Sequence, residues 1–152
     1  MPKHKTIHVN IGDLEADIDE MLAPLVKEIW KAGISTANSC QENQPGVAWI
    51  EFFSSIDATE FLDIVAGEYS DEFDSLYNRI RGEWSRTSDP VQGKWQFDIH
   101  PVDMSIRQWY VDDNIDEKPT GAPEFIFRVS IRFPCTDINV LLQRMLENGS
   151  VV

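Results

Sequence analysis

The stretch Val47-Ala48-Trp49-Ile50-Glu51-Phe52-Phe53 limits the folds that this chain can adopt. Six of its seven side chains are apolar, so a strand built from it has apolar side chains on both faces and belongs in the middle of a sheet. At the edge of a sheet such a strand would invite pairing with other chains. We therefore place residues 47–53 in the interior of a sheet. Glu51 then needs either a partner or an opening to solvent.

A strand, a helix and a polar run are predicted before this stretch. Residues 7–11 alternate apolar and polar side chains, which indicates a short opening strand. The acidic stretch 13–20 is expected to lead into a helix that ends at Gly33, where glycine serves as the C-cap. The polar run that follows is interpreted as a loop. The apolar face of the helix consists of Leu22, Leu25, Val26, Ile29 and Trp30.

Two helices are predicted after the apolar stretch. Asp57 followed by Glu60 resembles an N-cap pair, and Gly67 is expected to stop this helix. The next helix starts at Ser70 and closes at Gly82. The apolar residues with helical spacing in this second helix are Phe73, Leu76, Tyr77 and Ile80.

Strands dominate the second half of the chain, which then ends in a helix. The longest alternation of apolar and polar residues is followed by Pro134, which ends that strand. The final helix is capped by Thr136 or Asp137 and stops at Asn148-Gly149. The predicted strands of this half are 95–100, 104–111 and 125–133.

These elements predict an α+β fold. Neighbouring strands with short links favour an antiparallel sheet with helices packed mainly on one face, as in a ferredoxin-like sandwich or a decorated relative. The links are too short to mark a second domain, so residues 1–152 are expected to form one domain.

The charge of the chain restricts its partners. A formal net charge of −13 and a pI near 4.5 argue against binding nucleic acid or acidic membrane surfaces, because both require clustered Lys and Arg. No apolar run approaches the ~18 residues that cross a membrane, and no secretory signal is recognisable. We therefore expect a cytoplasmic protein with reduced thiols.

The polar run around Cys40 has two interpretations. Cys40 is either a small buried residue or a nucleophile that takes its base, His8 or His100, from elsewhere in the fold. No Lys or Arg occurs between residues 31 and 79 to lower the pKa of the Cys40 thiol. The two cysteines lack a short metal-ligand spacing, so neither a metal nor another cofactor is predicted. The run's other polar residues cap backbone groups or line a pocket that Glu51 could join; they are Thr36, Ser39 and Gln41.

The same run carries a resemblance. The pattern Trp30-x-x-Gly33-Ile34-x-Thr36-x-x-Ser39-Cys40-Gln41 is followed by Ala48-Trp49-Ile50-x-Phe52 and then by Ala58-x-x-Phe61-Leu62. Over residues 19–64 this arrangement resembles small uncharacterised bacterial and phage-associated proteins that share a helix, G-I-x-T-x-x-S-C-Q, strand core. The resemblance implies a shared fold and motif, and it carries no activity. Glu42 stands where those proteins often have glycine.

A second candidate site lies on the predicted strands of the second half. Asp98 and His100 share one strand face, and Arg128 and Arg132 share a face of the long strand. They could form cross-strand ion pairs on a solvated sheet face. They could also form a charged pocket in which His100 is an acid or base and the arginines bind a carboxylate or phosphate.

Three functions follow as hypotheses. The first is a non-enzymatic binding or interaction module, possibly a homodimer, with its site near Ser39-Cys40-Gln41 and an unspecified small-molecule or protein ligand. The second is a small cysteine-dependent hydrolase or transferase that uses Cys40 with His100 or His8. The third is an acidic inhibitor or nucleic-acid mimic, for which the negative charge is the motivation.

Overall fold

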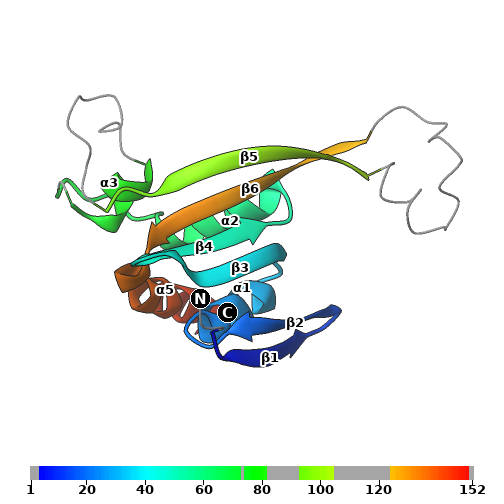
Figure 1. The fold of residues 1–152 in the computed structure, drawn as a ribbon. Helices are drawn as coiled ribbons and strands as arrows, with labels where there is room; N and C mark the ends of the chain where they lie inside the picture. Colours follow the sequence, from blue (N-terminus) through cyan, green and yellow to red (C-terminus); the bar gives the residue numbers. More distant parts are fainter. Residues whose placement is uncertain (1–3, 73, 82–92, 105–123, 151–152) are drawn as a thin grey trace, which may run out of the picture.

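The computed structural model describes residues 4–72, 74–81, 93–104 and 124–150. Within these ranges the chain forms two antiparallel sheets and four α-helices, so the predicted α+β class is confirmed (Figure 1). The elements are β1 (Thr6–Ile11), β2 (Leu14–Asp19), α1 (Ala23–Lys31), β3 (Thr36–Gln44), β4 (Val47–Phe52), α2 (Ser55–Val65), α3 (Leu76–Arg81), β5 (Gln96–Asp103), β6 (Phe125–Pro134), a 3-10 turn (Cys135–Asp137) and α5 (Ile138–Ser150).

The main sheet has four strands in the order β3-β4-β6-β5, and every neighbouring pair is antiparallel. β4 lies between β3 and β6, which confirms the interior position predicted for the apolar stretch 47–53. β3 pairs with β4 and β5 pairs with β6, and the two pairs meet where β4 pairs with β6. The ferredoxin-like arrangement is not confirmed, because that fold is built from split β-α-β units.

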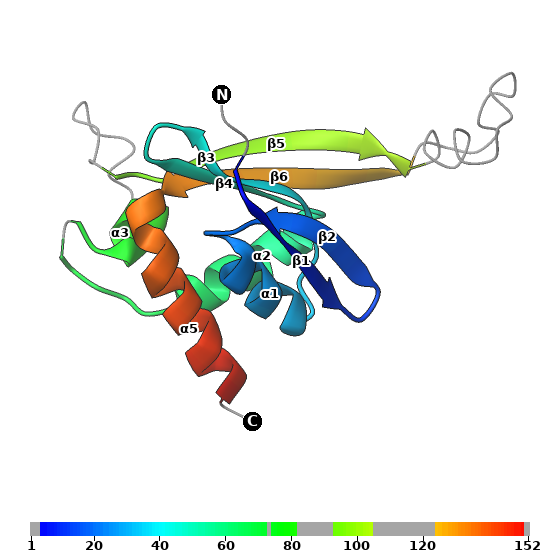
Figure 2. The same cartoon turned by 60° about the horizontal axis from the view of Figure 1, so that its bottom comes forward.

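Helices α1, α2 and α5 lie on one face of this sheet (Figure 2). The core fills the space between the helices and the sheet, and the predicted apolar face of α1 is buried there. Burial of this apolar surface is the main favourable term in folding. The sheet residues in the core are Ala48, Ile50, Phe52, Val129, Ile131 and Phe133.

Residues 14–19 form a strand rather than the approach to a helix. β1 and β2 pair with Ile11 opposite Leu14, which leaves Gly12-Asp13 as a two-residue turn. Gly12 has a φ of 58°, a left-handed conformation that hairpin turns of this length require. Apolar residues alternate with acidic ones along β2, and this is a strand pattern that the prediction of an acidic helix approach overlooked.

The polar run predicted to be a loop is mostly strand β3, at one edge of the main sheet. Gln44 lies opposite Val47, so Pro45-Gly46 is the turn into β4, and Gly46 has a φ of 75°. Polar side chains are favoured at a sheet edge, since they discourage pairing with other chains. Such a strand has no apolar alternation by which the sequence could reveal it.

Several helix boundaries also differ from the prediction. The N-cap of α2 is Ser54, whose Oγ accepts the Asp57 N–H at 3.2 Å, so Asp57 with Glu60 is not the cap pair. Ser54 and Asp57 have the spacing of a capping box. At the other end of the chain, α5 continues through Asn148-Gly149 to Ser150.

Helix α3 is shorter than predicted, because it begins at Leu76 instead of Ser70. Its predicted end at Gly82 lies outside the described residues, as do Phe73 and most of the predicted strand 104–111. Among the helices that the structure describes, none has both the length and the apolar character that a membrane span requires.

A buried ion pair anchors the start of β5. Asp137 accepts two hydrogen bonds from Arg79, at 2.6 Å to Oδ2 and 2.9 Å to Oδ1. The indole Nε1 of Trp95 donates to the same Oδ2 at 3.0 Å. These bonds compensate the burial of the carboxylate. They also hold Trp95, just before β5, against the residues that lead into α5.

Candidate functional site

The β1–β2 hairpin meets the main sheet at the edge of β3. Asp19, the last residue of β2, accepts the backbone N–H of Gln41 at its Oδ2, at 2.9 Å. The Met21 N–H donates in turn to Oε1 of Gln41, at 2.8 Å. An outward N–H of an edge strand therefore has a partner within the same chain, and the hairpin is fixed to β3.

His4 lies at the same junction. Lys5 accepts the Glu20 N–H at 2.8 Å, which holds the chain before β1 against the end of β2. Nε2 of Gln41 donates to Nδ1 of His4 at 2.9 Å. Because Oε1 of Gln41 already accepts from Met21, the amide presents its nitrogen to the imidazole. Nδ1 is therefore the acceptor, and the neutral ring carries its proton on Nε2.

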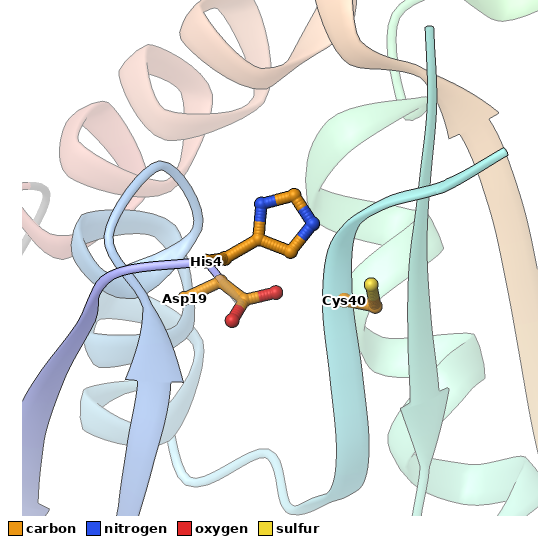
Figure 3. A group of neighbouring side chains, drawn as sticks. All are labelled: His4, Asp19 and Cys40. Carbon is orange, nitrogen blue, oxygen red and sulfur yellow. The ribbon is translucent and has the colours of Figure 1, made fainter. Parts of the chain in front are cut away.

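His4, Asp19 and Cys40 form a group of donor side chains at this junction. One nitrogen, one carboxylate oxygen and the sulfur all lie within 4.8 Å of one another, and all three residues are partly buried. Figure 3 shows the imidazole and the carboxylate beside β3, which carries Cys40. Cys40 is a free thiol. No hydrogen bond joins these three described side chains to one another, so they lie close together without being paired.

The remaining residues of the predicted polar site have structural contacts. Thr36 accepts a hydrogen bond from Nε1 of Trp30 at 2.9 Å, and so it links β3 to α1. The Ser39 N–H donates a hydrogen bond to Oδ1 of Asn38 at 2.8 Å. Cys135 donates its thiol to the Gln41 carbonyl at 3.0 Å. Burial, followed by the charge of Glu42, raises the pKa of the Cys135 thiol.

The structure does not bring Cys40 together with His8 or His100. His8 is exposed on β1, where its ring nitrogens bond to Asp17 at 2.8 Å and to Glu15 at 2.9 Å. The pKa of His8 is raised, first by the hydrogen bond to Asp17 and then by Glu15. His100 lies on β5, which β4 and β6 separate from β3, so the two strands are roughly 14 Å apart.

Sequence reasoning missed His4 and Asp19 as neighbours of Cys40. His4 precedes the predicted opening strand, and Asp19 lies within the stretch 13–20 that was expected to lead into a helix. Only the hairpin brings them together, with Thr6 paired to Asp19. The turn Gly12-Asp13 between two alternating runs is the signal that could have revealed this hairpin. Their approach to β3 has no signal in the sequence.

The second predicted group lies on the sheet face opposite the helices. Glu51 accepts a hydrogen bond from a serine of β6 at 3.2 Å and lies 4.0 Å from Nη1 of Arg128. Arg132 donates to Oδ2 of Asp98 at 2.9 Å, which is a cross-strand ion pair of the kind considered above. His100 is exposed and registers with Arg128. Each of these two arginines faces a carboxylate, so this face presents paired charges and not an excess of positive charge that could bind an anion.

Strands β5 and β6 extend beyond the helices as a two-stranded arm (Figures 1 and 2). The apolar row of β6 continues from the buried Val129 to Phe127 and Phe125, which are 49% and 55% exposed. β5 adds Phe97 and Ile99 on the same side, 40% and 65% exposed, since Ile99 pairs with Val129. We call these four exposed side chains the apolar arm. Contiguous exposed patches of this kind mark interaction surfaces.

Strand β5 is also the second edge of the described sheet. Met104 donates its N–H to Glu124 O at 2.8 Å, and alternate residues of an antiparallel strand bond to opposite sides. The backbone groups of Phe97, Ile99 and Pro101 therefore point away from β6. Pro101 has no N–H to offer, and proline within a sheet is confined to edges or bulges. This proline is a signal that could have identified β5 as an edge strand.

The chain is similar in sequence to an uncharacterised protein of Acanthamoeba polyphaga mimivirus, with 28% identity over 137 residues. The alignment covers 88% of this chain and 63% of the viral protein, so the chain spans less than two thirds of the length of that relative. No family model and no solved structure matches the chain. The similarity attaches no activity, so function has to be argued from the described residues.

Proposed function

We propose that this protein is a non-enzymatic interaction module that self-associates, with a second copy of the chain pairing along β5. The observation that carries this proposal is that β5, an edge strand whose outward side no described strand covers, also carries exposed side chains of the apolar arm. An apolar edge strand is a template for pairing with another strand, and proteins that leave it bare use it for assembly or risk aggregation.

The outward backbone of β5 suits pairing with an identical strand. A two-fold axis at Ile99 sets the two β5 strands antiparallel, and Ile99 of each copy then exchanges both backbone hydrogen bonds with the other. Phe97 donates its N–H to the carbonyl of Pro101 in the other copy, because proline still accepts hydrogen bonds. The interface is isologous, so it closes as a dimer.

The side chains of β5 match this register. In this proposed register, Asp98 of each copy is set opposite His100 of the other copy, a pairing of a carboxylate with an imidazole. Phe97 lies opposite Pro101 of the other copy, and the two apolar arms become neighbours on one face. Burial of apolar surface is worth ~25 cal/mol per Å², so pairing removes an unfavourable exposure. Because the outward side of β5 is complementary to itself in this register, we propose a second copy of the chain as the partner.

This interface is separate from the site predicted near Ser39-Cys40-Gln41, which lies at the opposite edge of the sheet. The alternative of a cysteine-dependent enzyme has no support from the described contacts of Cys40, because its thiol is not hydrogen-bonded to a histidine. We therefore place the interaction surface along β5 and not near Ser39-Cys40-Gln41.

Sedimentation velocity of the full chain over a range of concentrations tests the proposal. The wild-type chain is expected to form a reversible dimer. Ile99→Lys is expected to raise the dissociation constant by roughly 10²- to 10⁴-fold, since each dimer loses two buried isoleucines worth about 1.5–3 kcal/mol each and every 1.4 kcal/mol is tenfold.

Ile56→Lys is the matched control. Ile56 lies on α2 rather than on a strand, and at 70% exposed it resembles Ile99 in residue type and exposure. It should leave the dissociation constant unchanged. A wild-type chain that sediments as a monomer at every concentration, or two variants with equal effects, would overturn the proposal.

A further inference from the structure

We propose that His4, Asp19 and Cys40 form a binding site for a thiophilic divalent metal ion, with Zn²⁺ as the best match. The site lies at the β3 edge of the sheet, so it is independent of the self-association proposed for β5. Three segments of the chain meet there: the residues before β1, the end of β2 and strand β3.

The donor set selects the class of metal. A thiolate, an imidazole and a carboxylate are the three ligand types that Zn²⁺ accepts in proteins. Mg²⁺ and Ca²⁺ require oxygen ligands throughout, so a sulfur and a nitrogen among three donors disfavour them. Sulfur also favours the softer end of the first-row divalent ions. Three protein ligands leave a fourth position of a tetrahedral site for water or an external ligand.

The spacing of the donors suits a shared ion better than a hydrogen-bonded triad. Metal–ligand distances of about 2.0–2.3 Å place the ligand atoms of a tetrahedral site roughly 3.3–3.8 Å apart. The donor atoms of His4, Asp19 and Cys40 lie within 4.8 Å of one another, and none of these three described side chains is hydrogen-bonded to another. A small inward rotation of partly buried side chains is enough to close the site.

Gln41 is hydrogen-bonded to two of the three proposed ligands. Its backbone N–H fixes the Asp19 carboxylate at 2.9 Å, and its side-chain amide fixes the imidazole of His4 at 2.9 Å. The contact to Asp19 orients that carboxylate for a metal, and the loss of such outer contacts typically lowers metal affinity roughly 10–100-fold. The net charge of −13 also favours a cation over an anion at any site on this protein.

Metal binding by His4 requires the side-chain amide of Gln41 to change its orientation. Its amide occupies Nδ1 of His4, which leaves Nε2 as the nitrogen for a metal. A neutral imidazole that binds through Nε2 carries its proton on Nδ1, so Gln41 must turn its amide to present oxygen. Met21 then loses the oxygen that it bonds to at 2.8 Å. Gln41→Glu supplies one carboxylate oxygen to each donor and should raise affinity by roughly tenfold.

A Co²⁺ titration of the full chain tests the site. The protein is reduced, stripped of metal with a chelator and titrated while its absorption spectrum is recorded; competition with Zn²⁺ then gives the zinc affinity. A thiolate-to-cobalt charge-transfer band is expected in the wild-type chain. Cys40→Ser should abolish that band, and His4→Ala should lower the affinity by more than the roughly 100-fold seen for outer contacts.

Matched controls come from the second cysteine and from an exposed histidine. Cys135→Ser should keep the charge-transfer band, because its thiol is committed to the Gln41 carbonyl. His8→Ala should keep the affinity, because His8 is bonded to other carboxylates on the far part of the hairpin. Absence of the band in the wild-type chain, its persistence in Cys40→Ser or its loss in Cys135→Ser would overturn the site.

Misfolding is separated from loss of a ligand in two ways. Thermal unfolding in chelator should be similar for the wild-type chain and Cys40→Ser, whereas added Zn²⁺ should raise the unfolding temperature of the wild-type chain alone. Gln41→Glu tests for a gain of affinity, which a misfolded variant could not produce. A lower affinity in Gln41→Glu would contradict the assigned role of His4.

Discussion

The two edge strands of the main sheet, β3 and β5, differ in the polarity of their side chains and in what packs against their outward sides. β3 is polar, and its Gln41 N–H is bonded to Asp19 of the β1–β2 hairpin. β5 carries exposed Phe97 and Ile99, and no described strand pairs with its outward side. A sheet edge is a hazard that proteins cover or charge. One edge of this protein is covered by its own hairpin, and we propose that a second copy covers the other.

The contrast also separates two kinds of chemistry. Covering the β3 edge brings donor atoms from distant parts of the chain within 4.8 Å of one another, and this creates a place for a metal ion. No described strand pairs with the outward side of β5, and its apolar side chains are exposed for the association that we propose. The two proposals can therefore fail independently of each other.

The largest expected effect comes from opening the β3 edge. Asp19→Ala removes a partly buried carboxylate that accepts a backbone N–H, and the free energy of unfolding should fall by about 1.5–3 kcal/mol. Asp17→Ala is the control, because Asp17 is exposed on the same strand and should matter much less. Urea unfolding in chelator measures both. Equal losses for the two variants would mean that Asp19 does not hold the edge closed.

A pair of proline substitutions tests the direction of the backbone along β5. The N–H of His100 is directed toward β6, so His100→Pro should lower the free energy of unfolding by about 1–3 kcal/mol. The N–H of Ile99 points outward, so Ile99→Pro should leave the monomer nearly as stable and abolish self-association. Urea unfolding at a monomeric concentration and sedimentation measure the two effects. A reversed order of stability would contradict the assigned outer side of β5.

The smallest effect is a difference in labelling rate between the two thiols beside β3. The raised pKa of Cys135 leaves less thiolate at any given pH, so iodoacetamide should modify Cys135 slowly in the native chain. Its rate should rise steeply with pH as the thiol ionises. Peptide mapping by mass spectrometry measures each cysteine separately. Zn²⁺ should slow the labelling of Cys40 alone, and equal protection of both thiols would count against the assigned ligand.

Much of the fold could be predicted because apolar periodicity reports which face of an element is covered. The stretch 47–53 identified an interior strand, and the spacing from Leu22 to Trp30 identified the buried face of α1. Strands β2 and β3 were missed because their side chains are largely acidic or polar. Their hairpin turns, Gly12-Asp13 and Pro45-Gly46, were the available signals.

The sequence by itself determined the α+β class and the interior strand, since these depend on patterns within a few neighbouring residues. Only the tertiary structure decided which residues meet Cys40. His4 and Asp19 reach it because the hairpin docks on β3, and no local pattern encodes that contact. The alternation of residues 125–133 was likewise visible, but only the packing shows that three of the five apolar residues in that row are buried, whereas Phe125 and Phe127 are exposed. Periodicity reports which side of a strand is apolar, whereas the partner that covers this side is set by contacts between distant parts of the chain.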